Sequence, residues 1–146
     1  MLKLQWSKVA LSALIFMVIA SIIRQIEALL TMNYYTLPEY FSVWSKSMMP
    51  TAGPPPASFM IMSLAFAFVT GFVLAAFYNF IKDGIPGGYI KKVTWFTLII
   101  FVLAFVMFAL PLFLMINLPI GLQITWLIST FIIFFLNSLV FAKLIK

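Results

Sequence analysis

The stretch VTWFTLIIFVLAFVMFALPLFLMIN, residues 93–117, decides the fold class, because it runs for 25 residues without a charged side chain. A bilayer's hydrocarbon core of about 30 Å needs about 20 apolar residues of α-helix, at a rise of about 1.5 Å per residue. The stretch is therefore long enough to cross a membrane. Its hydrophobicity is continuous rather than alternating, which favours a helix over a strand of a membrane barrel.

Three further apolar stretches reach a similar length, and we expect spans at about 8–30, 58–81, 93–117 and 120–142, with an outer loop at 31–57. The composition agrees, since the 146 residues are 65% hydrophobic and only 8% charged, against about 25% charged in soluble domains. The sequence predicts an all-α integral membrane protein with a single domain, residues 1–146. Its four transmembrane helices are expected to form an antiparallel up-down bundle.

The lysines predict how these spans are oriented. One lysine, Lys46, falls on one side of the predicted membrane, and seven fall on the other: Lys3, Lys8, Lys82, Lys91, Lys92, Lys143 and Lys146. Because cytoplasmic loops carry an excess of positive charge, we expect both termini in the cytoplasm and the protein in the plasma membrane. The net charge of +6 then forms a collar that attracts anionic lipid headgroups. Nucleic acid is not an expected partner, since no basic domain gathers these charges.

The first span carries the one pair of opposite charges inside an apolar stretch. Arg24 and Glu27 are three residues apart, which places them on adjoining turns of one helix face. A signal peptide is the alternative for this stretch, but the stretch is long for one, and the pair occupies the place of the cleavage region. A charge inside a membrane costs about 2.5 to 3.5 kcal/mol on insertion scales, so each should find a polar partner.

Several uncharged polar residues are predicted at a depth similar to that of the pair: Gln25, Asn33, Asn117, Gln123 and Thr125. Together with Arg24 and Glu27 they predict a polar vestibule that opens outward. The inner half of the spans has fewer polar residues, chiefly Thr70, Asn79, Thr130 and Asn137. These are too sparse to predict a continuous pore.

The second span has a strip of small or short polar residues at every fourth position: Ser63, Ala67, Gly71, Ala75 and Asn79. Such a strip lets two helix backbones approach closely, which matters because lipid gives helices no hydrophobic drive to associate. We expect the strip to pack against the first or the fourth span. A homodimer face is the alternative.

The loops and one proline predict three local features. A short interfacial helix is expected around Pro38 to Met48, where aromatic residues cluster at headgroup level. Gly84 is expected to end the second span in the left-handed conformation. Pro111 lacks an N–H and is expected to kink the third span.

The composition excludes many chemistries and leaves three classes of function. The chain has no cysteine and no histidine, and its three acidic residues are scattered, so we expect no metal site, no cofactor and no enzymatic activity. The favoured function is an accessory or structural subunit of a larger membrane complex, with other membrane chains or further copies of itself as partners. The alternatives are a small oligomeric transporter or channel with its site at Arg24 and Glu27, and a lipid-binding protein.

Overall fold

The computed structural model describes residues 5–35, 37–40 and 57–146, and every regular element in these ranges is helical. In chain order the elements are α1 (Trp6–Leu30), α2 (Met32–Tyr35), the 3₁₀ turn η1 (Pro38–Tyr40), α4 (Ala57–Ile81), α5 (Tyr89–Ala104), the π-helical turn η2 (Phe105–Ala109), α6 (Leu110–Met115) and α7 (Ile120–Leu144). Four stretches, α1, α4, α5 to α6, and α7, are long and apolar enough to cross a membrane. The predicted all-helical fold with four candidate spans is confirmed.

The helix ends differ from the predicted spans by a few residues. The third stretch begins at Tyr89 rather than at residue 93, because Lys91 and Lys92 are good helix formers whose long side chains can reach the headgroup region. It ends at Met115, since Ile116 is extended, with φ −124° and ψ 128°. The fourth helix continues to Leu144, with Lys143 in its last turn, where a cation interacts favourably with the helix dipole.

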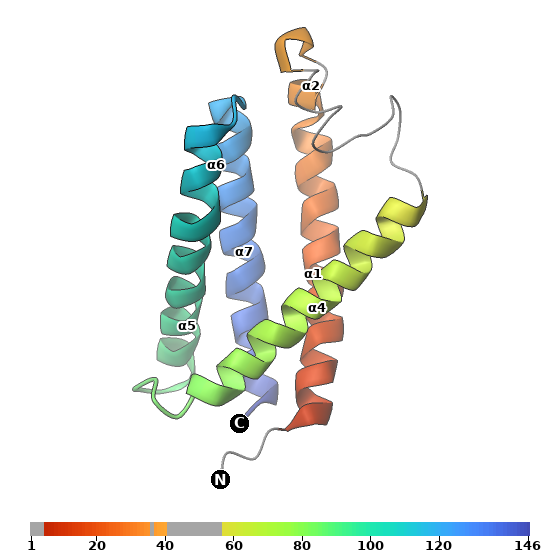
Figure 1. Cartoon of the computed structure of the whole chain (residues 1–146). Helices are drawn as coiled ribbons and strands as arrows, with labels where there is room; N and C mark the ends of the chain where they lie inside the picture. Colours follow the sequence, from red (N-terminus) through yellow and green to blue (C-terminus); the bar gives the residue numbers. More distant parts are fainter. Residues whose placement is uncertain (1–4, 36, 41–56) are drawn as a thin grey trace.

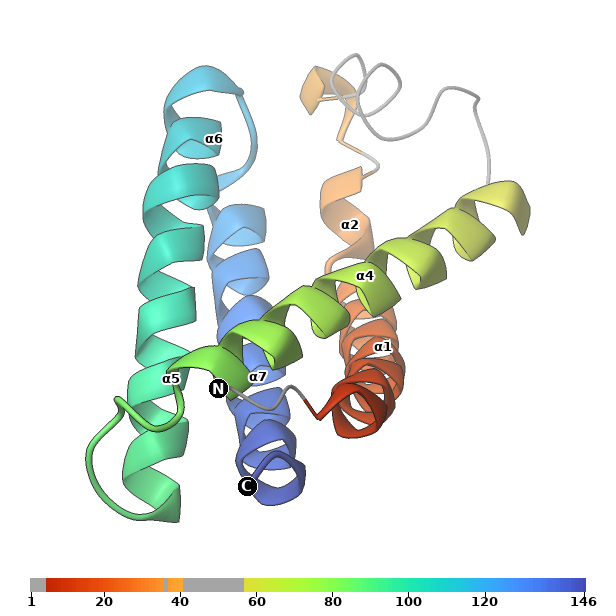
Figure 2. The ribbon, with the colours of Figure 1, turned by 60° about the horizontal axis from the view of Figure 1, so that its bottom comes forward.

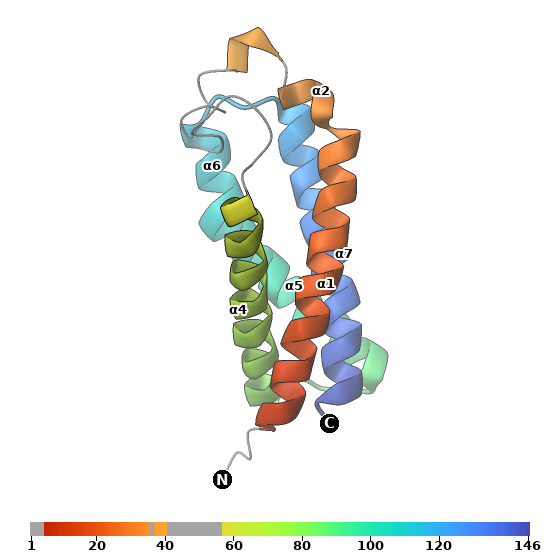
Figure 3. The same cartoon turned by 90° about the vertical axis from the view of Figure 1, so that its right-hand side faces the viewer.

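Three of the spans stand side by side, and α4 crosses them obliquely (Figure 1). Helix α1 packs against both α4 and α7, and α7 packs against α5. The inclination of α4 is clearest in Figure 2, and in the side view α1 and α4 lie in front of α5 and α6 (Figure 3). The described part of α1 starts, and α7 ends, at the same end of the molecule (Figure 1).

An aromatic cluster joins all four spans at the end that holds the termini. The ring of Tyr78 on α4 lies edge-on to that of Phe96 on α5, with centroids 5.0 Å apart. Phe141 on α7 contacts both rings and stacks on Phe16 of α1, at 6.5 Å. All four side chains are at most 3% exposed. The main core of the molecule therefore lies at this end.

The third span changes its hydrogen-bonding pattern ahead of Pro111. In the turn Phe105–Ala109 the helix is π-helical, and the backbone N–H of Leu110 donates to the carbonyl of Phe105, five residues back. A proline has no N–H to donate to the carbonyl four positions before it. The helix accommodates this missing hydrogen bond by forming the wider π-helical turn. The irregularity lies directly before the proline.

Two of the predicted loop features differ in the structure. Among the described residues, the glycine with positive φ is Gly87, at +98°, so the prediction for Gly84 is wrong. The backbone N–H of Gly84 instead donates to the carbonyl of Ile81, which closes the helix end without a left-handed residue. The predicted interfacial helix is described only at Pro38–Tyr40, where it is a single 3₁₀ turn; its remainder lies outside the described residues.

Candidate functional site

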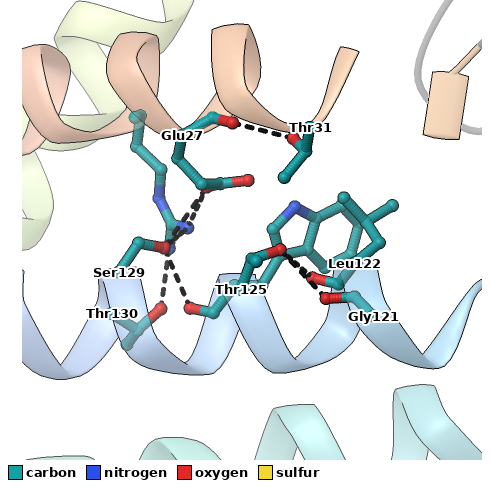
Figure 4. A network of polar contacts seen from close by, with 9 residues as sticks. Glu27, Thr31, Gly121, Leu122, Thr125, Ser129 and Thr130 are labelled. Atoms are coloured by element: carbon teal, nitrogen blue, oxygen red, sulfur yellow. Dashed lines mark hydrogen bonds and ion pairs between the residues drawn. The ribbon is translucent and has the colours of Figure 1, made fainter. Parts of the chain in front are cut away.

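Arg24 and Glu27 lie in the last third of α1, and Figure 4 shows Glu27 facing α7. The Nη1 group of Arg24 donates to Glu27 Oε2 at 2.9 Å, as the spacing of three residues on a helix predicts. The two side chains differ in exposure, because Glu27 is 8% exposed whereas Arg24 is 45% exposed. The carboxylate is therefore held inside the bundle, and the guanidinium lies at its edge.

The same guanidinium binds α7. Its Nη1 donates to Ser129 Oγ and its Nη2 to Thr130 Oγ1, both at 2.8 Å. The Ser129 hydroxyl also lies 3.3 Å from Glu27 Oε2 and 3.1 Å from the carbonyl of Trp126. Arg24, Glu27, Ser129 and Thr130 thus form one polar network, which we call the α1–α7 clamp.

Arg24 bonds to Thr130, a residue predicted to lie farther in than Arg24, in the inner half of the spans. Side chains on a helix lean toward its N-terminus, so the long Arg24 side chain extends deeper into the membrane than its own Cα. It therefore meets Thr130, ten residues inside α7, although Arg24 is six residues from the end of α1. Ser129 was missed, and the adjacent hydroxyls of Ser129 and Thr130 in a charge-free span are the signal that could have identified both.

Glu27 has a second, unsatisfied oxygen. Its Oε1 is buried and has no hydrogen-bond partner among the described residues. The backbone of Glu27 is fully hydrogen-bonded at its carbonyl, which accepts from the Thr31 hydroxyl at 2.8 Å and from the Thr31 N–H at 3.0 Å. Figure 4 shows this carboxylate between Thr31 and the α7 residues of the clamp. One oxygen of the carboxylate is committed to the clamp, and the other can still accept a bond.

Aromatic residues close the end of this site that is nearer to α2 and to the start of α7. Tyr34, Tyr35 and Trp126 pack against Leu118 and Leu122. Burial raises the pKa of the Tyr35 phenol above its ordinary value, and the negative charge of Glu27 raises that pKa further. Tyr35 therefore keeps its proton beside the carboxylate throughout the physiological pH range.

The structure places the other predicted site residues outside the clamp. Gln25 is exposed on α1. Asn117 and Gln123 line a shallow hollow of about 440 Å³ at the turn between α6 and α7, where Gln123 Nε2 donates to the carbonyl of Leu118 at 3.3 Å. The hydroxyl of Thr125 bonds back to carbonyls of its own helix (Figure 4). The polar residues expected in one vestibule are thus divided among several places.

The small-residue strip of α4 is divided in two. Gly71, Ala75 and Asn79 are buried, and a Cβ built on Gly71 would lie 2.6 Å from the Cβ of Phe16 on α1. Only a glycine allows the two helices to approach so closely at this point. Ser63 is exposed and Ala67 is half-buried. The half of the strip nearer the termini is therefore covered within the chain, and the other half is not.

The clamp can bind and orient but offers little for catalysis. Its one carboxylate is paired with an arginine, and serine and threonine hydroxyls need an adjacent base to act as nucleophiles. The described residues hold no group of three or more potential metal-ligating His, Cys, Asp or Glu side chains. Comparisons with protein-family models, with curated proteins and with solved structures give no match.

Proposed function

We propose that this chain is a non-catalytic subunit of a larger membrane assembly, in which it has an accessory or structural role. The observation that carries the proposal is the unpacked half of α4. From Ala57 to Phe66 every residue is exposed, so this part of α4 contributes no buried side chain to the described part of the chain. By contrast, α1 has buried residues along its whole length, from Val9 to Glu27.

A membrane helix without a packed face is stabilised little by the other helices of its own chain. Helices in lipid are held by van der Waals contact and by hydrogen bonds, because lipid tails are as apolar as the side chains. The oblique course of α4 (Figures 1 and 2) carries this half away from its neighbours, with the half-buried Ala67 and the exposed Ser63 as the continuation of the strip. Small residues of this kind favour close approach by a second helix. We take the occupant to be a transmembrane helix of a different protein.

The clamp is consistent with the same proposal, because the oppositely charged side chains of Arg24 and Glu27 are paired with each other and bonded to α7 of the same chain. Arg24 links α1 to α7 through Ser129 and Thr130, and the exposed residues Ala57–Phe66 of α4 take no part in this network. We further propose that both termini face the cytoplasm. At the end of the molecule that holds them, the Lys82 ammonium donates to the carbonyl of Lys146, and Lys92 Nζ donates to the carbonyl of Lys82 at 2.8 Å, so lysines from three helix ends gather there, as on a cytoplasmic side.

Co-purification in mild detergent tests the proposal, with a matched pair of substitutions. Ser63→Phe fills the uncovered strip, whereas Ala65→Phe adds the same ring to an exposed residue off the strip. We expect a partner protein at fixed stoichiometry with the unmodified chain and with Ala65→Phe, and its loss with Ser63→Phe. A chain that purifies alone, or a partner that Ser63→Phe leaves in place, contradicts the proposal.

A second candidate, a small oligomeric transporter, is supported by one observation, the buried and unpaired Oε1 of Glu27. An acceptor of this kind inside a membrane can bind a proton or a cationic group. Reconstitution in vesicles tests this candidate. Flux that Glu27→Gln abolishes supports transport, and the absence of flux for protons and small cations contradicts it.

A further inference from the structure

One face of α1 is exposed along most of the length of the helix. Its positions alternate by four and three residues along the helix: Ser7, Leu11, Leu14, Val18, Ser21, Gln25 and Ala28. All of these side chains are exposed except that of Ser21, which is half-buried. The buried residues of α1, such as Val9, Ala13 and Phe16, fall on the opposite face of the helix. We call the exposed set the α1 seam; its spacing is that of the contact line between two helices in a left-handed coiled coil.

Gln25 is the strongly polar member of the seam. Its side-chain amide has no hydrogen-bond partner among the described residues, although it lies one residue from Arg24, within the apolar part of the span. An amide left without partners in an apolar medium is destabilising by roughly 2 kcal/mol or more. In coiled coils a single polar residue at such a position pairs with its counterpart and fixes the register. We therefore expect the helix that packs on the seam to have a polar group at the depth of Gln25.

Arg24 flanks the seam and sets the charge of what can cover it. A guanidinium has five N–H donors, and three of the five donate to Glu27, Ser129 and Thr130. The other two lie on a side chain that is 45% exposed. Glu27 already balances the positive charge, so a carboxylate from a partner would add an unpaired negative charge to the membrane. The complementary partner group is an uncharged acceptor.

We infer that a second copy of this chain covers the α1 seam, with the two copies related by a two-fold axis along the membrane normal. Copies inserted in the same direction present the same residues at the same depth, and a two-fold contact is self-complementary. Gln25 then meets Gln25 of the second copy, whose amide oxygen also lies beside Arg24. The seam requires a donor whose charge is balanced, which is Arg24, and an uncharged acceptor, which is the amide oxygen of Gln25. These two residues are adjacent on one helix. This contact is separate from the α4 surface of the proposed function.

Cysteine cross-linking in membranes tests the inference directly, because the chain has no cysteine of its own. Val18→Cys and Ser21→Cys place a thiol on the seam, and Ile26→Cys places one on an exposed part of α1 off the seam. Disulfides form only where Cα atoms approach within about 7 Å. We expect oxidation to convert the two seam variants to covalent dimers while Ile26→Cys stays monomeric. Equal cross-linking at all three positions, or none on the seam, overturns the inference.

A second measurement isolates the role of Gln25. Energy transfer between donor-labelled and acceptor-labelled chains, followed as lipid is added, gives the dimer dissociation constant. Gln25→Leu replaces the amide by an apolar side chain, and we expect it to weaken the dimer about threefold to tenfold, as for interhelical hydrogen bonds in membranes. The control Ile26→Leu should leave the constant unchanged. A Gln25→Leu dimer as tight as the unmodified one contradicts the proposed pairing. Loss of the α4 partner through Ser63→Phe, with the dimer intact, separates the two proposals.

Discussion

The two ends of this molecule hold their helices together by different means. At the end with the termini, all four spans meet around Tyr78, Phe96 and Phe141. At the other end α1 and α7 remain joined through the clamp, while residues Ala57–Phe66 of α4 are all exposed. Lipid competes with any loosely fitting apolar contact, so spans stay together only where side chains fit closely or hydrogen bonds link them.

Removal of an aromatic ring should have the largest effect, and only at the packed end. Phe141 is 0% exposed and Phe66 is 75% exposed. Phe141→Ala leaves a cavity between four helices, and we expect a loss of about 3 kcal/mol in the free energy of unfolding, the low end for buried phenylalanines because the ring moves into lipid rather than water. Phe66→Ala should change it by less than about 0.5 kcal/mol. Unfolding in mixed micelles measures both; similar losses would show that the ends do not differ in packing.

The approach of α4 to α1 gives the next largest effect. Gly71→Ala places a Cβ 2.6 Å from the Cβ of Phe16, so the helices must separate although alanine is the better helix former. We expect a destabilisation of about 1 to 3 kcal/mol, as for overpacked cores. Gly88 is the matched control, since a Cβ there meets nothing within 4 Å. A neutral Gly71→Ala would mean that α1 and α4 are not in close contact.

The smallest effect concerns the aromatic residues above the clamp. Because the pKa of Tyr35 is raised in the folded chain, the unfolded chain loses the phenol proton at a lower pH than the folded chain does. Stability is therefore unaffected below about pH 10, the ordinary pKa of the phenol, and falls as the pH rises through the raised value. We expect Tyr35→Phe to lose less of its thermal stability than the unmodified chain between about pH 9 and pH 11. Identical pH profiles for the two chains would contradict the burial of this phenol.

The four spans could be predicted because length and apolar composition alone decide membrane insertion. The arrangement of the spans could not. The oblique course of α4 depends on the contact of Gly71 with Phe16 and on the exposed half that follows it toward the loop. A repeat of small residues marks a possible contact face but does not say how far along the helix the contact extends.

The candidate site was predictable in part for a similar reason. The bond between Arg24 and Glu27 follows from a spacing within one helix, but the partners on α7 depend on the stagger between two helices. Thr130 was not predicted as a partner of Arg24, because counting from helix ends ignores the length and direction of an arginine side chain. Gly84 and Gly87 are too close in sequence for local pattern to decide which one takes the left-handed conformation.

Arg24 bonds across α1 and α7 and in this way holds the two helices together. A double-mutant cycle with Arg24→Gln and Thr130→Val, measured by unfolding in lipid micelles, tests it most directly, because the 2.8 Å bond joins these two residues. The matched cycle uses Thr125→Val, whose hydroxyl bonds to its own helix. We predict a coupling energy of about 0.6 to 1.7 kcal/mol for Arg24 with Thr130, the range for hydrogen bonds between membrane helices, and none with Thr125. Equal coupling in the two cycles, or none in either, would contradict the account.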